Sequence, residues 1–169
     1  LIYNRTSIDQ TITLDPSGGQ QTSVAKTVEK SGWLMTLEAS AGIYSDLHNR
    51  IGLLETAENG IDWRDNPEIS SPGDGVSLFF KNSEDDKNIE ITSDIQSLDS
   101  ETKVWDAFIR NQTQFEVELT WSFPQKMDND MVLRIMDINT RRVIDPSSVS
   151  SISLGEVSSR YDRGLKIIS

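Results

Sequence analysis

The side chains best able to do chemistry are carboxylates and amides in the middle of the chain. Residues 38–101 hold fifteen acidic and four basic residues, an imbalance equal to the whole formal net charge of −11. Carboxylate and amide oxygens are the ligands that Ca²⁺ accepts in proteins. A candidate calcium site would therefore take its oxygens from Asp46, Asn49, Asp62 and Asp65. The Asp-x-Asp-x-Asp-Gly loop of an EF-hand is absent, so the alternative is an acidic face that only contacts solvent.

Aromatic residues offer a second candidate site, for carbohydrate. Trp63 lies between charged residues in a segment without strand character, and Tyr44 is a candidate companion. A flat aromatic ring beside carboxylates is a common feature of sugar-binding surfaces. The favoured role for Trp63 is nevertheless to anchor its loop in the core, with sugar binding as the alternative. The remaining tryptophans occur in apolar patterns and are expected in the core: Trp33, Trp105 and Trp121.

Catalytic motifs are weak by comparison. The single histidine, His48, excludes zinc sites built on two or three imidazoles, and no Gly-x-Ser-x-Gly elbow presents a serine to it. The chain has no cysteine, which excludes thiol catalysis and disulfides. A glycosidase needs two paired carboxylates, and no pattern selects two from Asp62, Asp65, Glu68 and Asp74. We therefore predict a protein without catalytic residues, and with calcium as its one candidate cofactor.

The charge also limits the partners. A net charge of −11 repels phosphate backbones and anionic membrane surfaces, so nucleic acid is excluded as an expected partner. No stretch approaches the roughly 20 apolar residues of a membrane span, so we predict no membrane insertion. The two sequons, at Asn4 and Asn111, are too short a pattern to carry an argument.

The elements that must position these residues are strands, because the hydrophobic pattern repeats every two residues. Residues 33–39, 76–80 and 115–121 alternate apolar with polar or mixed side chains. Such alternation predicts strands with one buried face, which is typical of an antiparallel sandwich rather than a doubly wound parallel sheet. We predict an all-β, antiparallel β-sandwich, immunoglobulin-, fibronectin- or jelly-roll-like. Further strands are expected at residues 10–14, 89–92, 104–109, 132–138, 142–144 and 165–168.

The remaining segments set the expected domain organisation. Residues 40–72 are poor in strand signals and rich in Asp, Asn and Gly, which predicts a long acidic loop region. A loop of that length is functional, braced by metal, or hides an unrecognised strand. Only residues 20–30 could form a helix. We expect residues 1–31 to form an N-terminal strand or arm packed on a sandwich domain of residues 32–169.

Several short motifs resemble a known family. They are the run GWLMTLEA at 32–39, the spaced sets Asp46-x-x-Asn49-x-Ile51-Gly52 and Gly60-Ile61-Asp62-x-x-Asp65, and GVSLFF at 75–80. In the second half they are Ser93-Asp94-Ile95, Trp105-Asp106, Leu119-Thr120-Trp121, Asp137 and the run RVID at 142–145. Together they resemble the fibronectin- or immunoglobulin-like accessory modules of secreted bacterial proteins that precede type IX secretion sorting domains. Leu165 stands where that family usually has phenylalanine. The resemblance implies a secreted β-sandwich module without known catalysis, and it implies no ligand.

These observations define the expected function. The chain opens at Leu1 in mid-pattern, which indicates a fragment of a larger protein. We predict a non-catalytic structural or interaction module of an exported bacterial protein, secreted or at the cell surface. Its partners would be other domains of the parent, or a surface glycan or protein. The alternative is a carbohydrate-binding module that uses Trp63 and Tyr44. A hydrolase fragment would require His48 or a close carboxylate pair to lie in a cleft.

Overall fold

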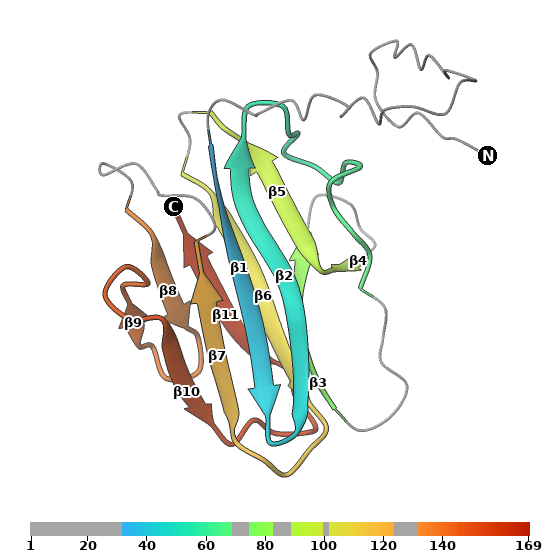
Figure 1. Ribbon diagram of the computed structural model, residues 1–169, viewed down its shortest axis with the longest axis vertical. Coiled ribbons are helices and arrows are strands. Elements are labelled where there is room, and N and C mark those ends of the chain that lie inside the picture. Colours follow the sequence, from blue (N-terminus) through green and yellow to red (C-terminus); the bar gives the residue numbers. More distant parts are fainter. Residues whose placement is uncertain (1–31, 69–74, 83–88, 100–101, 124–131) are drawn as a thin grey trace, which may run out of the picture.

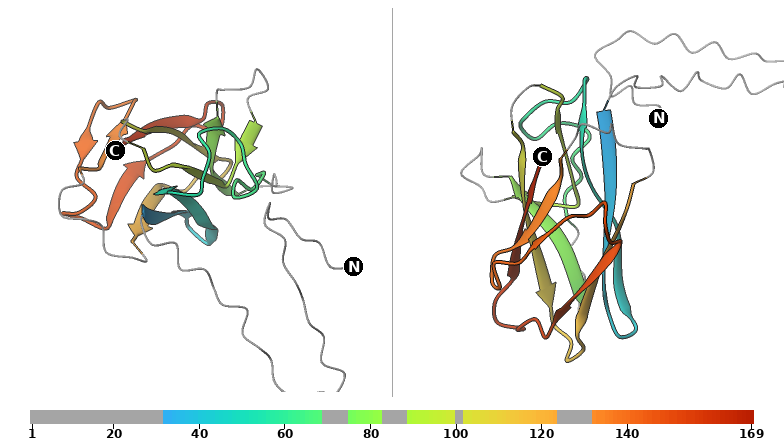
Figure 2. Two further views of the ribbon diagram at one scale, coloured as in Figure 1. Left: turned by 90° about the horizontal axis from the view of Figure 1, so that it is seen from above. Right: turned by 90° about the vertical axis from the view of Figure 1, so that its left-hand side faces the viewer.

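The computed structural model describes residues 32–68, 75–82, 89–99, 102–123 and 132–169, which form two β-sheets packed face to face (Figures 1 and 2). The five-stranded sheet has the order β10-β7-β1-β2-β5 and the six-stranded sheet the order β4-β3-β6-β11-β8-β9. The predicted all-β sandwich is confirmed. Strands of the first sheet are β1 (Gly32–Ala41), β2 (Tyr44–Leu54), β5 (Ser93–Ser97), β7 (Val117–Ser122) and β10 (Ser151–Gly155). Strands of the second are β3 (Val76–Asn82), β4 (Ile89–Ile91), β6 (Val104–Asn111), β8 (Arg134–Asp137), β9 (Val143–Ile144) and β11 (Arg163–Ile168).

The core lies between the sheets and follows the period-two pattern. Along β1 every second residue is buried and the intervening ones are half-buried, because successive side chains of a strand point to opposite faces. Strands β6 and β7 alternate in the same way. The three tryptophans expected in the core are there, and the Trp33 and Trp105 rings meet edge to face with centroids 5.5 Å apart. Their area makes this contact the centre of the hydrophobic core.

Strand β2 corrects the expectation of a long loop over residues 40–72. It occupies eleven residues of that segment, and only residues 42–43 and 55–68 of its described part lie outside the named strands. A β-bulge hid the strand, because Leu37 pairs with Asn49 whereas Ala39 pairs with Asp46. His48 takes up the extra residue with a φ of 71°. One extra residue reverses the alternation along a strand, so the period-two pattern is broken at this point.

The chain changes sheets between β4 and β5. Strand β4 pairs with β3 in one sheet, and β5 pairs with β2 in the other. Thr92 lies between the two strands. The β2–β5 pair is parallel, and all other strand pairs of the described residues are antiparallel. As a result β5 forms an edge of the five-stranded sheet next to residues 55–68 (Figure 1).

Some predictions fall on residues outside those described. These are the strand at 10–14, the helix at 20–30 and the N-terminal arm over 1–31. In the described ranges, no helix is long and apolar enough to cross a membrane. The strand expected from residue 115 begins at Val117 instead, and Phe115 is 45% exposed in the preceding turn.

Candidate functional site

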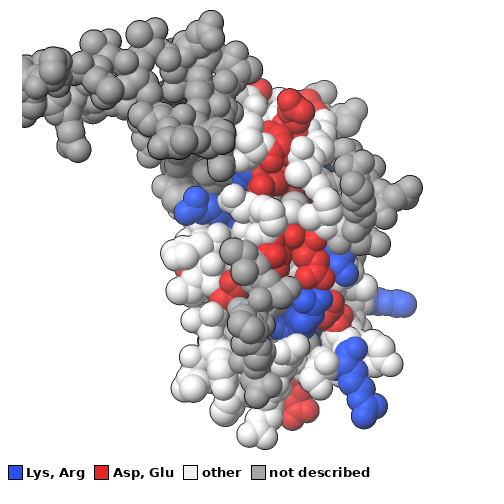
Figure 3. Space-filling model, turned by 90° about the vertical axis from the view of Figure 1, so that its right-hand side faces the viewer, with Lys and Arg blue, Asp and Glu red and all other residues white. Residues whose placement is uncertain are grey.

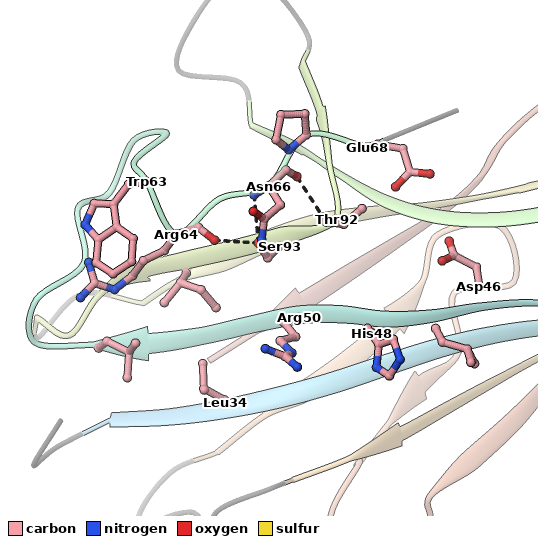
Figure 4. A pocket seen from close by; sticks show the side chains of 14 residues that line it. Leu34, Asp46, His48, Arg50, Trp63, Arg64, Asn66, Glu68, Thr92 and Ser93 are labelled. Carbon is pink, nitrogen blue, oxygen red and sulfur yellow. Dashed lines mark hydrogen bonds between the residues drawn. The ribbon is translucent and has the colours of Figure 1, made fainter. Parts of the chain in front are cut away.

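A groove of about 890 Å³ lies on the outer face of the five-stranded sheet beside β5 and extends to the part of β2 that carries Asp46. Its floor is formed by outward-facing residues of β1, β2 and β5, among them Leu34, Arg50 and Ile95. Its wall is the segment that carries Trp63 and Glu68. Figure 4 shows Trp63 at one end of this groove and Asp46 with Glu68 at the other. The groove therefore combines an apolar floor with polar groups at one end, as ligand sites commonly do.

Two of the predicted calcium ligands build the wall of the groove. The Asp65 carboxylate accepts hydrogen bonds from the Asp62 N–H at 2.9 Å and the Ile95 N–H at 3.0 Å. Asp62 Oδ1 accepts from the Arg64 N–H at 2.6 Å. Short acidic side chains stabilise turns by accepting such bonds from nearby backbone. Burial raises the pKa of Asp65, and these backbone bonds partly offset the rise. Both residues thus shape the loop that presents Trp63.

The same loop is attached to β4, to Thr92 and to the start of β5. Ser93 Oγ donates to the Arg64 carbonyl at 2.8 Å and accepts from the Asn66 N–H at 3.0 Å (Figure 4). The Thr92 N–H donates to the Asn66 carbonyl at 2.7 Å, and the Glu68 N–H donates to the Glu90 carbonyl at 2.9 Å. A small apolar cluster lies beneath: Leu34, Leu54, Ala57 and Ile95. Bonds that satisfy buried backbone groups on both sides make this wall an ordered part of the fold.

Trp63 stands at the rim of the groove and is 57% exposed. The expectation that it anchors its loop in the core is wrong. The Arg64 guanidinium lies 4.1 Å from the centre of its ring and donates to the Thr56 carbonyl at 3.0 Å. A cation over the ring face holds the indole by a cation–π contact. One face of the ring is thereby covered by Arg64, and the exposed remainder is available to a ligand.

Tyr44, the predicted companion of Trp63, lies elsewhere. It is the first residue of β2 and packs, half-buried, against the main core. Trp63 lies near the other end of that strand, since Arg64 is bonded to Thr56 just beyond Leu54. Ten residues of strand span about 33 Å. Tyr44 and Trp63 therefore do not form one aromatic platform.

Of the other two predicted calcium ligands, Asp46 lines the far end of the groove and Asn49 lies buried near it, outside the groove lining. Asp46 Oδ2 accepts a hydrogen bond from the Leu78 N–H of β3 at 2.6 Å, which joins the two sheets. Asn49 is fully buried, and neither polar atom of its side chain makes a hydrogen bond. Its amide nevertheless lies close enough to Asp46 to lower the pKa of that carboxyl, against the larger rise caused by burial. Asp46 and Asn49 thus belong to one cluster, and Asp62 and Asp65 to another.

Glu68 is the partner that the structure supplies for Asp46. The two carboxylates face one another from the wall and from β2 (Figure 4). Burial raises the pKa of Glu68 to about 7, and the charges of Asp46 and Glu90 add to the rise while Arg110 opposes it.

Figure 3 shows acidic side chains gathered along the side of the molecule that carries β4 and β5. Within the described ranges, no three His, Cys, Asp or Glu side chains are grouped so that they could hold a metal ion.

Several residues of the groove floor and wall were not predicted from the sequence. Arg50, Asn66 and Ser93 line the groove, but no spacing in the sequence marks them. The sequence named Glu68 only as one of four carboxylates from which no catalytic pair could be selected. His48 lines the groove, exposed, at the bulge of β2.

Models of known families, curated proteins and solved structures contain no match to this chain.

Substitution of Glu68 tests the electrostatics of this end of the groove. The folded-state pKa is about 7 against 4.5 ordinarily, so the folded protein binds this proton more tightly than the unfolded chain does. The stability that results is present below pH 4.5 and lost as the pH rises through 7. We expect Glu68→Gln to stabilise the metal-free protein by about 1 kcal/mol at pH 8, since solvent screens a half-buried group. Near pH 4 the substitution should have no effect.

The measurement is urea unfolding at both pH values in the presence of a chelator. Glu58→Gln is the matched control, because Glu58 is an exposed carboxylate of the same loop. A Glu68→Gln variant that is no more stable than wild type at pH 8 would contradict the predicted crowding of the carboxylates.

Proposed function

We propose that the chain is a non-catalytic binding module of a larger exported bacterial protein, and that its groove binds carbohydrate. The observation that carries the proposal is the Trp63 ring, 57% exposed at the rim of a groove of about 890 Å³. Large exposed aromatic rings beside a concavity indicate binding surfaces. An indole offers a flat apolar surface for the apolar face of a sugar ring, while polar groups nearby bond its hydroxyls.

The polar groups of the groove suit a neutral or mildly charged sugar chain. Arg50 is exposed on the floor, directly opposite Ser93 in the β2–β5 pair. The Thr92 and Asn66 side chains line the same stretch, between Trp63 and Glu68 (Figure 4). Donors from Arg and Asn and the hydroxyl of Thr can each bond sugar hydroxyls. An elongated groove with these groups along it favours a short stretch of polysaccharide over a compact ligand.

Titration with neutral oligosaccharides tests this proposal. Trp33, Trp105 and Trp121 are buried, so a ligand-dependent change in the emission of solvent-exposed tryptophan reports on Trp63. We expect saturable binding to at least one member of a panel of gluco-, xylo- and manno-oligosaccharides. Trp63→Ala should weaken that binding at least tenfold, because it removes the stacking surface. Calorimetric titration gives the affinities.

Tyr161→Ala is the matched control for that experiment. Tyr161 is 78% exposed and does not line the groove. Its removal should leave oligosaccharide affinity unchanged. Equal binding by wild type and Trp63→Ala, or no binding to any member of the panel, would remove the support for a carbohydrate site and leave a purely structural or interaction module.

A hydrolase is the competing function, because Asp46, His48 and Glu68 all line the groove. Burial raises the pKa of both Glu68 and Asp46, and two facing carboxyls are what a glycosidase uses. Against it, Asp46 Oδ2 is held by the Leu78 N–H at 2.6 Å, and the exposed indole lies at the opposite end of the groove. Prolonged incubation with the bound oligosaccharide distinguishes the two functions. Products that disappear in Glu68→Gln would establish hydrolysis; intact sugar would support binding alone.

A further inference from the structure

The end of the groove opposite Trp63 has a composition that the carbohydrate proposal does not use. The carboxylates of Asp46 on β2 and Glu68 in the wall face one another there (Figure 4), and the Glu68 backbone is bonded to that of Glu90 on β4. Arg110, the cation that partly offsets them, is already shared. Its guanidinium donates to Glu90 at 2.8 and 3.2 Å and to Asp162 at 3.1 Å. The Asp46–Glu68 pair therefore carries more negative charge than its neighbours balance.

A buried amide points to the same place. Asn49 has 0% of its surface exposed, and neither Oδ1 nor Nδ2 has a hydrogen-bond partner. Buried polar groups normally find a partner, and one that lacks it indicates a bound water or ion. The Asn49 amide lies beside the Asp46 carboxylate. Asp46 is one of the two carboxylates that face one another at this end of the groove (Figure 4).

The bulge in β2 is what brings these groups together. In a regular strand, residues three apart point to opposite faces. Here Asn49 pairs with Leu37 and Asp46 pairs with Ala39, both of which face the core. The extra residue at His48 thus turns Asp46 and Asn49 to the same side of the sheet. Bulges of this kind commonly redirect side chains at functional sites.

We propose that Asp46, Glu68 and the Asn49 side-chain oxygen bind a calcium ion at this end of the groove. All three donors are oxygens, and one of them is neutral, a mixture that calcium accepts with water completing its six to eight ligands. Magnesium requires a nearly ideal octahedron at shorter distances and is expected to bind poorly. The ion would balance the two carboxylates, satisfy the amide, and tie the end of the wall to β2. The ligand set differs from the sequence prediction, because Asp62 and Asp65 belong to the turn that carries Trp63, at the other end of the groove from Asp46 and Glu68.

Thermal unfolding of the full chain at pH 8 tests the site. The protein is first freed of metal with chelator and then titrated with CaCl₂ at constant ionic strength. Sites with few charged ligands bind calcium with dissociation constants of roughly 0.1–1 mM. At 10 mM calcium we expect the unfolding midpoint to rise by about 5 °C, because the ion binds only the native state. MgCl₂ at the same concentration should give a much smaller rise.

Two variants make the result specific. Glu68→Gln should abolish the calcium-dependent rise, although without metal at pH 8 it is expected to be at least as stable as wild type. A variant that loses the calcium response while it remains at least as stable as wild type without metal has lost a ligand and not its fold. Glu118→Gln removes an exposed carboxylate of β7 and should respond to calcium as wild type does.

Three outcomes would overturn the calcium site. They are an unchanged midpoint for wild type, an equal rise in wild type and Glu68→Gln, and equal effects of calcium and magnesium. None of them bears on the carbohydrate proposal, since that depends on Trp63 at the other end of the groove and is measured separately.

Discussion

Trp105→Ala is expected to lower the free energy of unfolding by about 3–5 kcal/mol, the usual cost of truncating a large buried aromatic residue. Trp105 has no exposed surface, and its ring packs against Trp33 at an interplanar angle of 71°. Its Nε1–H donates to the Asp94 carbonyl at 3.1 Å, so the substitution also leaves a buried acceptor without that donor. Urea unfolding followed by far-ultraviolet circular dichroism measures the loss.

Trp63→Ala is the internal comparison for this prediction. The same change of side chain at a position that is 57% exposed removes little buried area, and should cost less than about 1 kcal/mol. Similar losses at the two positions would show that the Trp33–Trp105 contact is not the centre of the core. The pair of variants therefore separates packing from the general effect of losing a tryptophan.

Asp137→Ala is expected to cost about 3–5 kcal/mol at pH 7, because it leaves a largely buried arginine without its counterion. Asp137 is 3% exposed, and its carboxylate accepts from Arg163 and from the Thr140 hydroxyl at 2.6 Å. Arg163 also donates to the Leu154 carbonyl at 2.6 Å. This network ties β8 and β11 to β10, and hence the six-stranded sheet to the five-stranded one. The measurement is urea unfolding at pH 7.

The effect of Asp137→Ala should shrink in acid. Burial would raise the pKa of Asp137, but hydrogen bonds from Arg163 and Thr140 and the charge of Arg163 outweigh it and hold the pKa below its usual range. The stability that the ionised carboxylate contributes is present above its ordinary pKa of 3.8. That stability is lost as the pH falls through the lower folded-state value. Stability curves of wild type and variant should therefore converge toward low pH.

A second ion pair on the same strand provides the control. Lys166 of β11 donates to Asp106 at 2.7 Å, with the two side chains 40% and 37% exposed. Exposed pairs contribute about 0–1 kcal/mol, so Asp106→Ala should have a small effect. An Asp137→Ala variant as mild as Asp106→Ala would mean that Arg163 finds another partner and that burial does not decide the strength of this pair.

The sequence predicted the sandwich well where strands are regular. In β1, β6 and β7 one face of each strand is apolar and the other is half-buried or exposed. That alternation depends only on the residues of the strand itself. The same pattern placed Trp33, Trp105 and Trp121 in the core, and all three are buried. Strand β2 was missed because the bulge at His48 breaks the alternation and its exposed face is polar.

The candidate site was predicted in its components and not in its arrangement. Trp63 was expected to anchor its loop, with sugar binding as the alternative, and the structure exposes it on a groove instead. Asp46 and Asn49 were identified as oxygen donors, and the bulge brings them to one side of β2. Asp62 and Asp65 have the same residue type but form hydrogen bonds within a turn. Residue type alone does not distinguish a carboxylate that shapes a loop from one that is free to bind an ion.

Local chemistry thus determined the all-β class and which face of β1, β6 and β7 is buried, and it supplied candidates for ligand binding. Only the tertiary structure decided which of them meet. Glu68 faces Asp46 because the segment at 66–68 bonds to the backbone at 90–92, where the chain crosses from β4 to β5. That pairing joins residues more than twenty positions apart, and it depends on the parallel placement of β5 beside β2. Contacts of this kind follow from how the two sheets bury their shared core, which no pattern of neighbouring residues encodes.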